Sequence, residues 1–90
     1  HIKDYALHQN HPNPFNTHTT IDYQLPKTSE VELSVFNLLG QKLTVLVSGS
    51  QPPGRYEIEW DATGIEGGVY FYKLSTDNGF VQTKKLILLK

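Results

Sequence analysis

Turn-forming residues interrupt this chain roughly every eight to twelve residues, and short segments of alternating apolar and polar side chains lie between them. The alternation is clearest in residues 19–25, 31–35 and 56–60. Successive side chains of a strand point to opposite faces, so each segment is predicted to be an antiparallel strand with one buried face. No segment keeps a helical period over a helix's length. The sequence therefore predicts an all-β fold, an immunoglobulin-like antiparallel β-sandwich of about seven strands.

The remaining strands are predicted from apolar runs and turn residues. A short strand is expected at residues 43–47, and the small and Pro-rich residues 48–54 are expected to form the turn after it. Residues 69–76 are apolar on both faces, which is typical of a central strand. The Asp-Asn-Gly sequence at 77–79 predicts a tight hairpin, because Asn-Gly favours positive φ angles. Residues 80–89 would then form the returning strand.

The chain is expected to hold one domain. Residues 1–10 offer few core candidates and are interpreted as a linker and first edge segment, with residues 11–90 as a single immunoglobulin-like domain. The sequence Gly68-x-Tyr70-x-Tyr72 resembles a tyrosine corner, in which Tyr70 bonds back to the backbone and Tyr72 points into the core. The expected core consists of the inward-facing residues of the strands: Ile21, Tyr23, Val31, Leu33, Val35, Tyr56, Ile58, Trp60, Tyr70, Tyr72 and Leu74.

Composition narrows the class of protein. The 90 residues are 38% hydrophobic and 19% charged, which suits a small folded domain rather than a disordered chain. A formal net charge of −1 gives no overall electrostatic footprint for nucleic acid. The chain has no cysteine, which excludes disulfides and thiolate chemistry, and no apolar run approaches the ~20 residues of a membrane helix. Because methionine is absent and the chain starts at His1, we expect a piece of a longer protein with any export signal upstream.

Residues that could carry catalysis or bind a metal are sparse. The four histidines fall at irregular spacing in or beside a Pro-rich segment, so we expect no metal site from His1, His8, His11 and His18. Glu57 and Glu59 share one face of a predicted strand about 7 Å apart, a separation that inverting glycosidases use. The alternation places that pair on the solvent side, so we interpret it as a hydrated strand face. The sequence also has no phosphate-binding loop and no nucleophile elbow, and we predict a non-catalytic chain without a cofactor.

Several blocks of sequence follow one another in an order that resembles a known family. Pro12, Asn13 and Pro14 open a stiff lead-in that continues through Phe15. Later blocks lie at residues 19–26, 35–41, 53–61, 67–72 and 83–87. Together they resemble the type A C-terminal sorting domain of the type IX (Por) secretion system. The immunoglobulin-like domain of flagellar hook-capping proteins is related and shares several blocks. Thr17 stands where the sorting family often has a further proline.

The resemblance implies a role in export. Members are carried as the C-terminal part of a passenger protein in a Bacteroidetes-type bacterium. The implied partners are the type IX translocon, a sortase-like protease and an N-terminal passenger domain, with no nucleic acid and no membrane span. The passenger would cross the periplasm and reach the outer membrane surface or the medium.

The basic last strand is the expected address. We predict that a partner reads Lys84, Lys85, Leu86, Ile87 and Lys90, by strand addition at an open sheet edge. Two other interpretations of this strand stay open: the lysines protect an exposed edge against aggregation, and the leucines complete the core. For the whole domain, a carbohydrate-binding module would need coplanar exposed aromatics, for which the candidates are Phe36, Phe71 and Phe80. A structural spacer would need none of these features.

Overall fold

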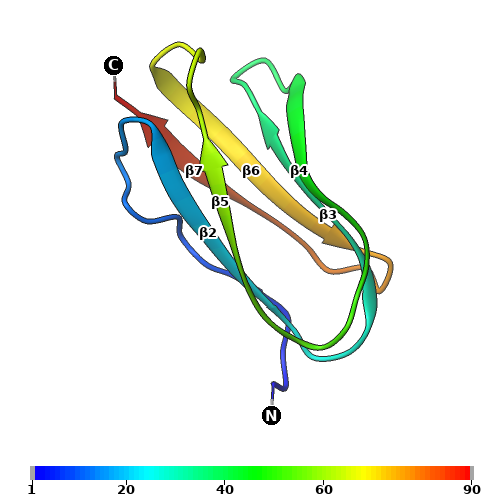
Figure 1. Ribbon diagram of the computed structural model, residues 1–90. Helices are drawn as coiled ribbons and strands as arrows, with labels where there is room; N and C mark the ends of the chain where they lie inside the picture. Colours follow the sequence, from blue (N-terminus) through cyan, green and yellow to red (C-terminus); the bar gives the residue numbers. More distant parts are fainter. Residues whose placement is uncertain (1, 90) are drawn as a thin grey trace.

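Seven strands in two antiparallel sheets make up the computed structural model, which describes residues 2–89. No helix occurs among these residues, and the predicted all-β sandwich is confirmed (Figure 1). The strands, in chain order, are β1 (Ala6–Leu7), β2 (His18–Leu25), β3 (Ser29–Phe36), β4 (Lys42–Gln51), β5 (Gly54–Asp61), β6 (Gly68–Thr76) and β7 (Val81–Leu88).

The two sheets have three and four strands. One sheet has the order β1-β2-β5, and the other has the order β4-β3-β6-β7, so β6 is central and β7 lies at an edge. The fourth strand belongs to the sheet of β3, unlike the constant-type immunoglobulin arrangement in which it joins the first sheet. The physical reason is the short turn at residues 37–41, where the amide of Gly40 donates to the Asn37 carbonyl at 3.0 Å and folds β4 directly back onto β3.

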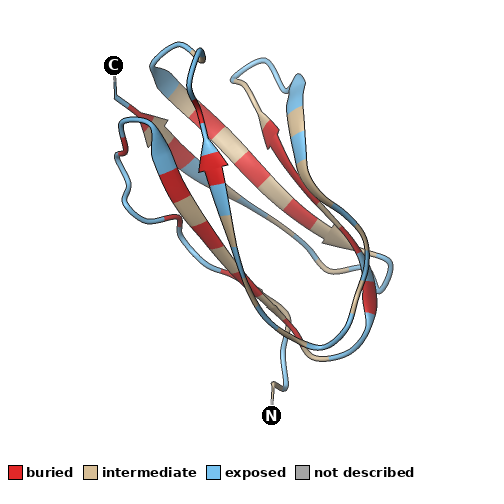
Figure 2. Cartoon of the chain, viewed as in Figure 1, coloured by how far each residue is buried: buried red, intermediate tan, exposed pale blue. Residues whose placement is uncertain are grey.

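The core lies between the sheets, and its side chains come from alternating positions. Figure 2 shows buried and partly exposed residues alternating along β2 and β6, whereas Leu33–Val35 of β3 are all buried. Nine of the eleven predicted core residues are buried. Tyr56 and Ile58 are only half-buried and pack against the core, because β5 is an edge strand with a neighbour on one side. Leu7 and Phe15, which the alternation did not indicate, are 3% and 2% exposed and belong to the core.

The prediction for residues 43–54 needs correction. Strand β4 spans Lys42–Gln51, so Ser48, Gly49 and Ser50 are paired with β3 rather than forming a turn. Small and polar residues have low β-propensity, but their pairing with the neighbouring strand overrides it. The chain reverses only at Pro52 and Pro53 before β5 begins.

The hairpin between β6 and β7 is as predicted. Residues 77–79 form its tip, and the amide of Thr76 donates to the Phe80 carbonyl at 2.9 Å. Gly79 has a φ angle of +92°, in the left-handed region that favours glycine.

Replacing Gly79 by valine is expected to destabilise the domain by about 1–3 kcal/mol. A Cβ at this position would meet no atom within 4 Å, so the cost comes from the backbone angle alone. Urea unfolding of Gly79→Val measures the effect, and Gly79→Asn is the matched control, because asparagine tolerates positive φ better than a β-branched residue. Equal free energies of unfolding for the wild type and Gly79→Val would contradict the prediction.

Candidate functional site: the terminal strand and the segment that covers it

Strand β7 carries most of the residues predicted to be an address, and its pleat separates them. Leu86 is fully buried, so its side chain cannot contact a partner while the domain is folded. Ile87 is half-buried and Lys85 exposed on the outer face. Lys84 is half-buried and lies opposite Tyr72, on the other face of the sheet from Lys85. The two lysines therefore do not form one patch. Lys90 lies outside the described residues.

The outer edge of β7 is partly covered by the lead-in, residues 9–15, which we name the strap. The side-chain amide of Gln9 donates to the Lys85 carbonyl at 2.8 Å, and the amide of Ile87 donates to Asn13 Oδ1 at 2.9 Å. Phe15 forms two backbone bonds: its N–H donates to the Ile87 carbonyl at 3.0 Å, and its carbonyl accepts from Leu89 at 2.7 Å. The chain at Phe15 forms a parallel β-bridge with β7 at Leu88. The strap thus acts as a short added strand.

The other side of the strap is bonded to the opposite sheet. His11 and Thr20 exchange both backbone hydrogen bonds, each at 2.9 Å, which fixes the strap to β2. Because the same seven-residue stretch reaches β7, it joins the two sheets along one side of the sandwich. Figure 1 shows this segment, in blue, passing from the side of β2 to the arrowhead of β7.

Asn10 is the polar centre of this closure and is only 2% exposed. Its backbone N–H donates to the Tyr72 hydroxyl at 2.8 Å, and that hydroxyl donates to the His8 carbonyl at 2.6 Å. The Asn10 side-chain amide donates to Thr19 Oγ1 at 2.8 Å, and its oxygen accepts from Gln9 at 2.7 Å. These partners satisfy a side chain that would otherwise be costly to bury.

An aromatic cluster holds the end of the strap. The Phe15 and Trp60 rings lie 5.9 Å apart and tilted, and Trp60 meets Tyr70 edge-on at 6.4 Å. Tyr70 donates its hydroxyl proton to the Glu66 carbonyl, which is the bond that the tyrosine-corner pattern predicts. Tyr72 is fully buried, as that pattern also predicts. Gly68 begins β6. The corner and the strap therefore share one packing unit.

Burial perturbs two tyrosines of the core. It raises the pKa of Tyr72 from 10.0 to about 12, with the hydrogen bond from Asn10 opposing and Asp22 reinforcing the change. Burial likewise raises the pKa of Tyr23 to about 12, against the hydrogen bond to Gln51. Both phenols stay neutral in the folded domain, whereas an unfolded chain would ionise them near the ordinary value of 10.0.

The contribution of these two tyrosines to the free energy of unfolding is therefore expected to be complete below pH 10. It should be lost as the pH rises from 10 to about 12. Each tyrosine should contribute about 2–3 kcal/mol to this loss, because one pKa unit corresponds to about 1.4 kcal/mol. Urea unfolding across this alkaline range tests the slope. In Tyr72→Phe the free energy of unfolding should decrease less steeply with pH, because one of the two tyrosines no longer ionises. The same decrease in Tyr72→Phe and the wild type would contradict the raised pKa of Tyr72.

The described residues assemble no evident catalytic or metal-binding group. The Nε2 atom of His11 lies 3.0 Å from Asp22 Oδ2. The Nε2 atom of His18 lies 3.4 Å from Asp61 Oδ2, between the paired strands β2 and β5. No cluster of three or more histidine, aspartate or glutamate side chains suited to a metal forms among them. The absence of a metal site stays a prediction. Glu57 and Glu59 are both exposed, in agreement with a hydrated strand face.

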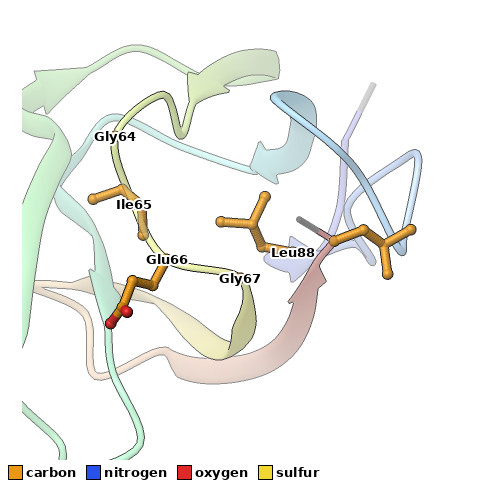
Figure 3. Close-up of a pocket in the computed structure, with 6 residues that line it drawn as sticks. Gly64, Ile65, Glu66, Gly67 and Leu88 are labelled. Atoms are coloured by element: carbon orange, nitrogen blue, oxygen red, sulfur yellow. The ribbon is translucent and has the colours of Figure 1, made fainter.

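An open hollow lies beside the end of β7 (Figure 3). It is formed by the loop of Gly64, Ile65, Glu66 and Gly67 and by Leu88 and Leu89. Leu88 points toward the loop in this view, whereas the Glu66 carboxylate points away from Leu88. A lining of glycine backbone and aliphatic side chains with one carboxylate offers no acid–base pair.

The three aromatic candidates for sugar binding lie in two places. Phe36 and Phe71 are cross-strand neighbours on the outer face of the four-stranded sheet, in a shallow groove that Leu38 and Lys73 also line. The Lys73 ammonium lies 5.2 Å from the centre of the Phe36 ring. Phe80 stacks instead on Tyr5, with ring centres 5.3 Å apart. No platform of all three rings forms.

The strap was only partly visible in the sequence. Pro12, Asn13 and Pro14 marked a stiff segment, but nothing indicated that Gln9 and Asn10 bond to β6 and β7. The signal that could have found it is Phe15, a lone aromatic in a polar, Pro-rich stretch. Such a residue needs a buried position, and the described fold supplies one beside Trp60.

The fold and its covered last strand define a small all-β sandwich module that is closed on one side by its own lead-in. The family model described as the secretion system C-terminal sorting domain matches residues 10–89. This match spans most of the chain, so the chain belongs to that family, the C-terminal sorting domains of type IX secretion. Searches of curated proteins and of solved structures each gave no significant match. No helix in the part of the chain described is long and apolar enough to cross a membrane.

Proposed function

We propose that this chain is a non-catalytic sorting domain that directs a passenger protein, joined at its N-terminal side, through the type IX secretion system. The family match over residues 10–89 carries the proposal. Sorting domains of this family are in general not catalytic, which agrees with the single carboxylate, that of Glu66, in the lining of the hollow beside β7. The passenger crosses the periplasm and reaches the outer membrane surface or the medium. Its partners are the type IX translocon and a sortase-like protease.

The terminal strand is proposed as the segment that this machinery reads. Its support is positional: β7 is an edge strand, and it presents Lys85 and Ile87 on the outer face and Lys84 beside the inner one. The lysines give selectivity for an acidic partner and a salt-sensitive association rate. Leu86 contributes indirectly, because its buried side chain holds the strand in the sheet.

The proposed function is tested by fusing the chain to the C-terminus of a reporter in a host with a type IX system. The secreted fraction of the reporter is compared with that in the same host without its translocon, and with that of the reporter lacking the chain. Secretion should require both the chain and the translocon. A reporter that stays in the cell despite an intact translocon and a folded domain would overturn the proposal.

The basic residues are tested by replacing Lys84, Lys85 and Lys90 with glutamine. Lys85 is exposed and Lys84 half-buried, and charges at the surface contribute little to stability. The melting temperature of the purified domain should therefore hardly change while the secreted fraction of a fused reporter falls. The matched control is the triple variant Lys3→Gln, Lys27→Gln and Lys42→Gln, whose lysines lie outside β7. Secretion at the wild-type level in the first variant would show that basic recognition is wrong.

A further inference from the structure

The strap covers only one half of the outer edge of β7. Its bonds reach the Lys85 carbonyl, both backbone groups of Ile87 and the amide of Leu89. In a strand, the outward-facing backbone groups belong to every second residue. The same edge therefore continues backwards to Val81 and Thr83, for whose outward groups no hydrogen bond is found within residues 2–89.

The side chains along this open half are exposed, and the nearby strand β1 pairs with β2 in the other sheet. The Val81 side chain is 58% exposed, and Thr83 and Lys85 are exposed as well. The strap demonstrates that the neighbouring part of the edge accepts an extended segment through main-chain hydrogen bonds. An unpaired edge next to a paired one is suited to the addition of a second extended segment.

Positive charge flanks the open half from both faces of the sheet. Lys84 and Lys85 follow Thr83 directly and point to opposite faces. Lys73 lies opposite Thr83 on β6 and adds positive charge to the outer face, although its ammonium is directed at the Phe36 ring on β3. None of these three lysines has a carboxylate within salt-bridge distance in the described part of the chain. A strand added at Val81 and Thr83 would thus meet positive charge on either side, whichever way its side chains alternate.

From this geometry we infer that the open edge at Val81 and Thr83, beside Lys85, is the docking site for an extended acidic segment of the export machinery, which adds as a strand alongside β7. The inference rests on the proposed sorting function and deepens it. The accessible address is then the first half of β7, near the hairpin. The second half, toward Leu89, is occupied by the strap.

A proline substitution at the open edge tests whether the partner binds through main-chain hydrogen bonds. Thr83→Pro removes an N–H that the β6 ladder does not use, and proline is tolerated at such edge positions. Secretion of a fused reporter is expected to fall at least about tenfold because a main-chain hydrogen bond is lost and the ring obstructs the edge. The matched control is Ser48→Pro on β4, the opposite edge strand of the same sheet, where the alternation also points the N–H outward. A reporter fused to the Ser48→Pro variant should be secreted at the wild-type level.

Introducing negative or positive charge at the open edge tests whether the docking partner is acidic. The double variant Val81→Asp and Thr83→Asp should cut secretion at least about fivefold by repelling an acidic segment, whereas Val81→Lys with Thr83→Lys should keep it. Melting temperatures of all purified variants report folding, and if Thr83→Pro does not fold, the charge pair decides. Equal secretion by the aspartate pair and the wild type overturns the inference and leaves sorting intact, as does equal loss in both pairs. Failure of the unmodified chain to direct secretion overturns both proposals.

Discussion

Replacing Phe15 by alanine should destabilise the domain by about 3–5 kcal/mol, because the change empties a buried aromatic site. Phe15 is 2% exposed and packs against Trp60, so the lost ring leaves a cavity in the centre of the aromatic cluster. A domain of this size has only about 5–13 kcal/mol of stability in total, so the loss is a large share of it. Urea unfolding followed by Trp60 fluorescence measures the free energy directly.

The same substitution should also loosen the strap from β7. Amide hydrogen exchange at Leu89, whose N–H donates to the Phe15 carbonyl, should speed up more than exchange at Leu74 in the central strand β6. Phe36→Ala is the matched control, since that ring is half-buried on the outer face and should cost markedly less. A Phe15→Ala domain as stable as Phe36→Ala would show that the strap does not depend on its aromatic side chain.

Sequence reasoning succeeded where local pattern and tertiary position agree. Strands β2 and β3 alternate apolar and polar side chains because the apolar face of each packs on the core, and this periodicity is readable in isolation. The same holds for the hairpin at Gly79, where a single backbone angle decides the residue type. The strand predicted at residues 43–47 is shorter than β4, because Ser48–Ser50 are strand residues only through their pairing with β3.

The strap shows where such reasoning ends. Gln9 and Lys85 are 76 positions apart, and their hydrogen bond leaves no periodic trace in either segment. Asn10 reads as an ordinary polar loop residue, yet it is buried because Tyr72 and Thr19 supply partners from two different sheets. The pleat of β7, in contrast, can be inferred from the sequence: adjacent residues of a strand point to opposite faces, so Lys84 and Lys85 cannot share one patch.

Leu86→Ala is expected to destabilise the domain by about 2–5 kcal/mol, because a fully buried side chain on the terminal strand is removed. Leu86 lies opposite Tyr70, so the cavity opens beside the tyrosine corner. Secretion of a fused reporter should then fall together with the melting temperature. The loss would come from unfolding and not from a missing contact with the translocon.

Ile87→Ala separates the two causes, because this side chain is half-buried on the outer face and its removal leaves the core filled. Ile87→Ala should keep a melting temperature close to that of the wild type, so any loss of secretion in it reports recognition. Deletion of the end of β7 lacks this power, since it removes both the Leu86 and Leu88 side chains from the core and the backbone groups that hold the strap. If Leu86→Ala keeps the wild-type melting temperature yet loses secretion, Leu86 is itself read by the machinery. The strand would then have to leave the sheet during export.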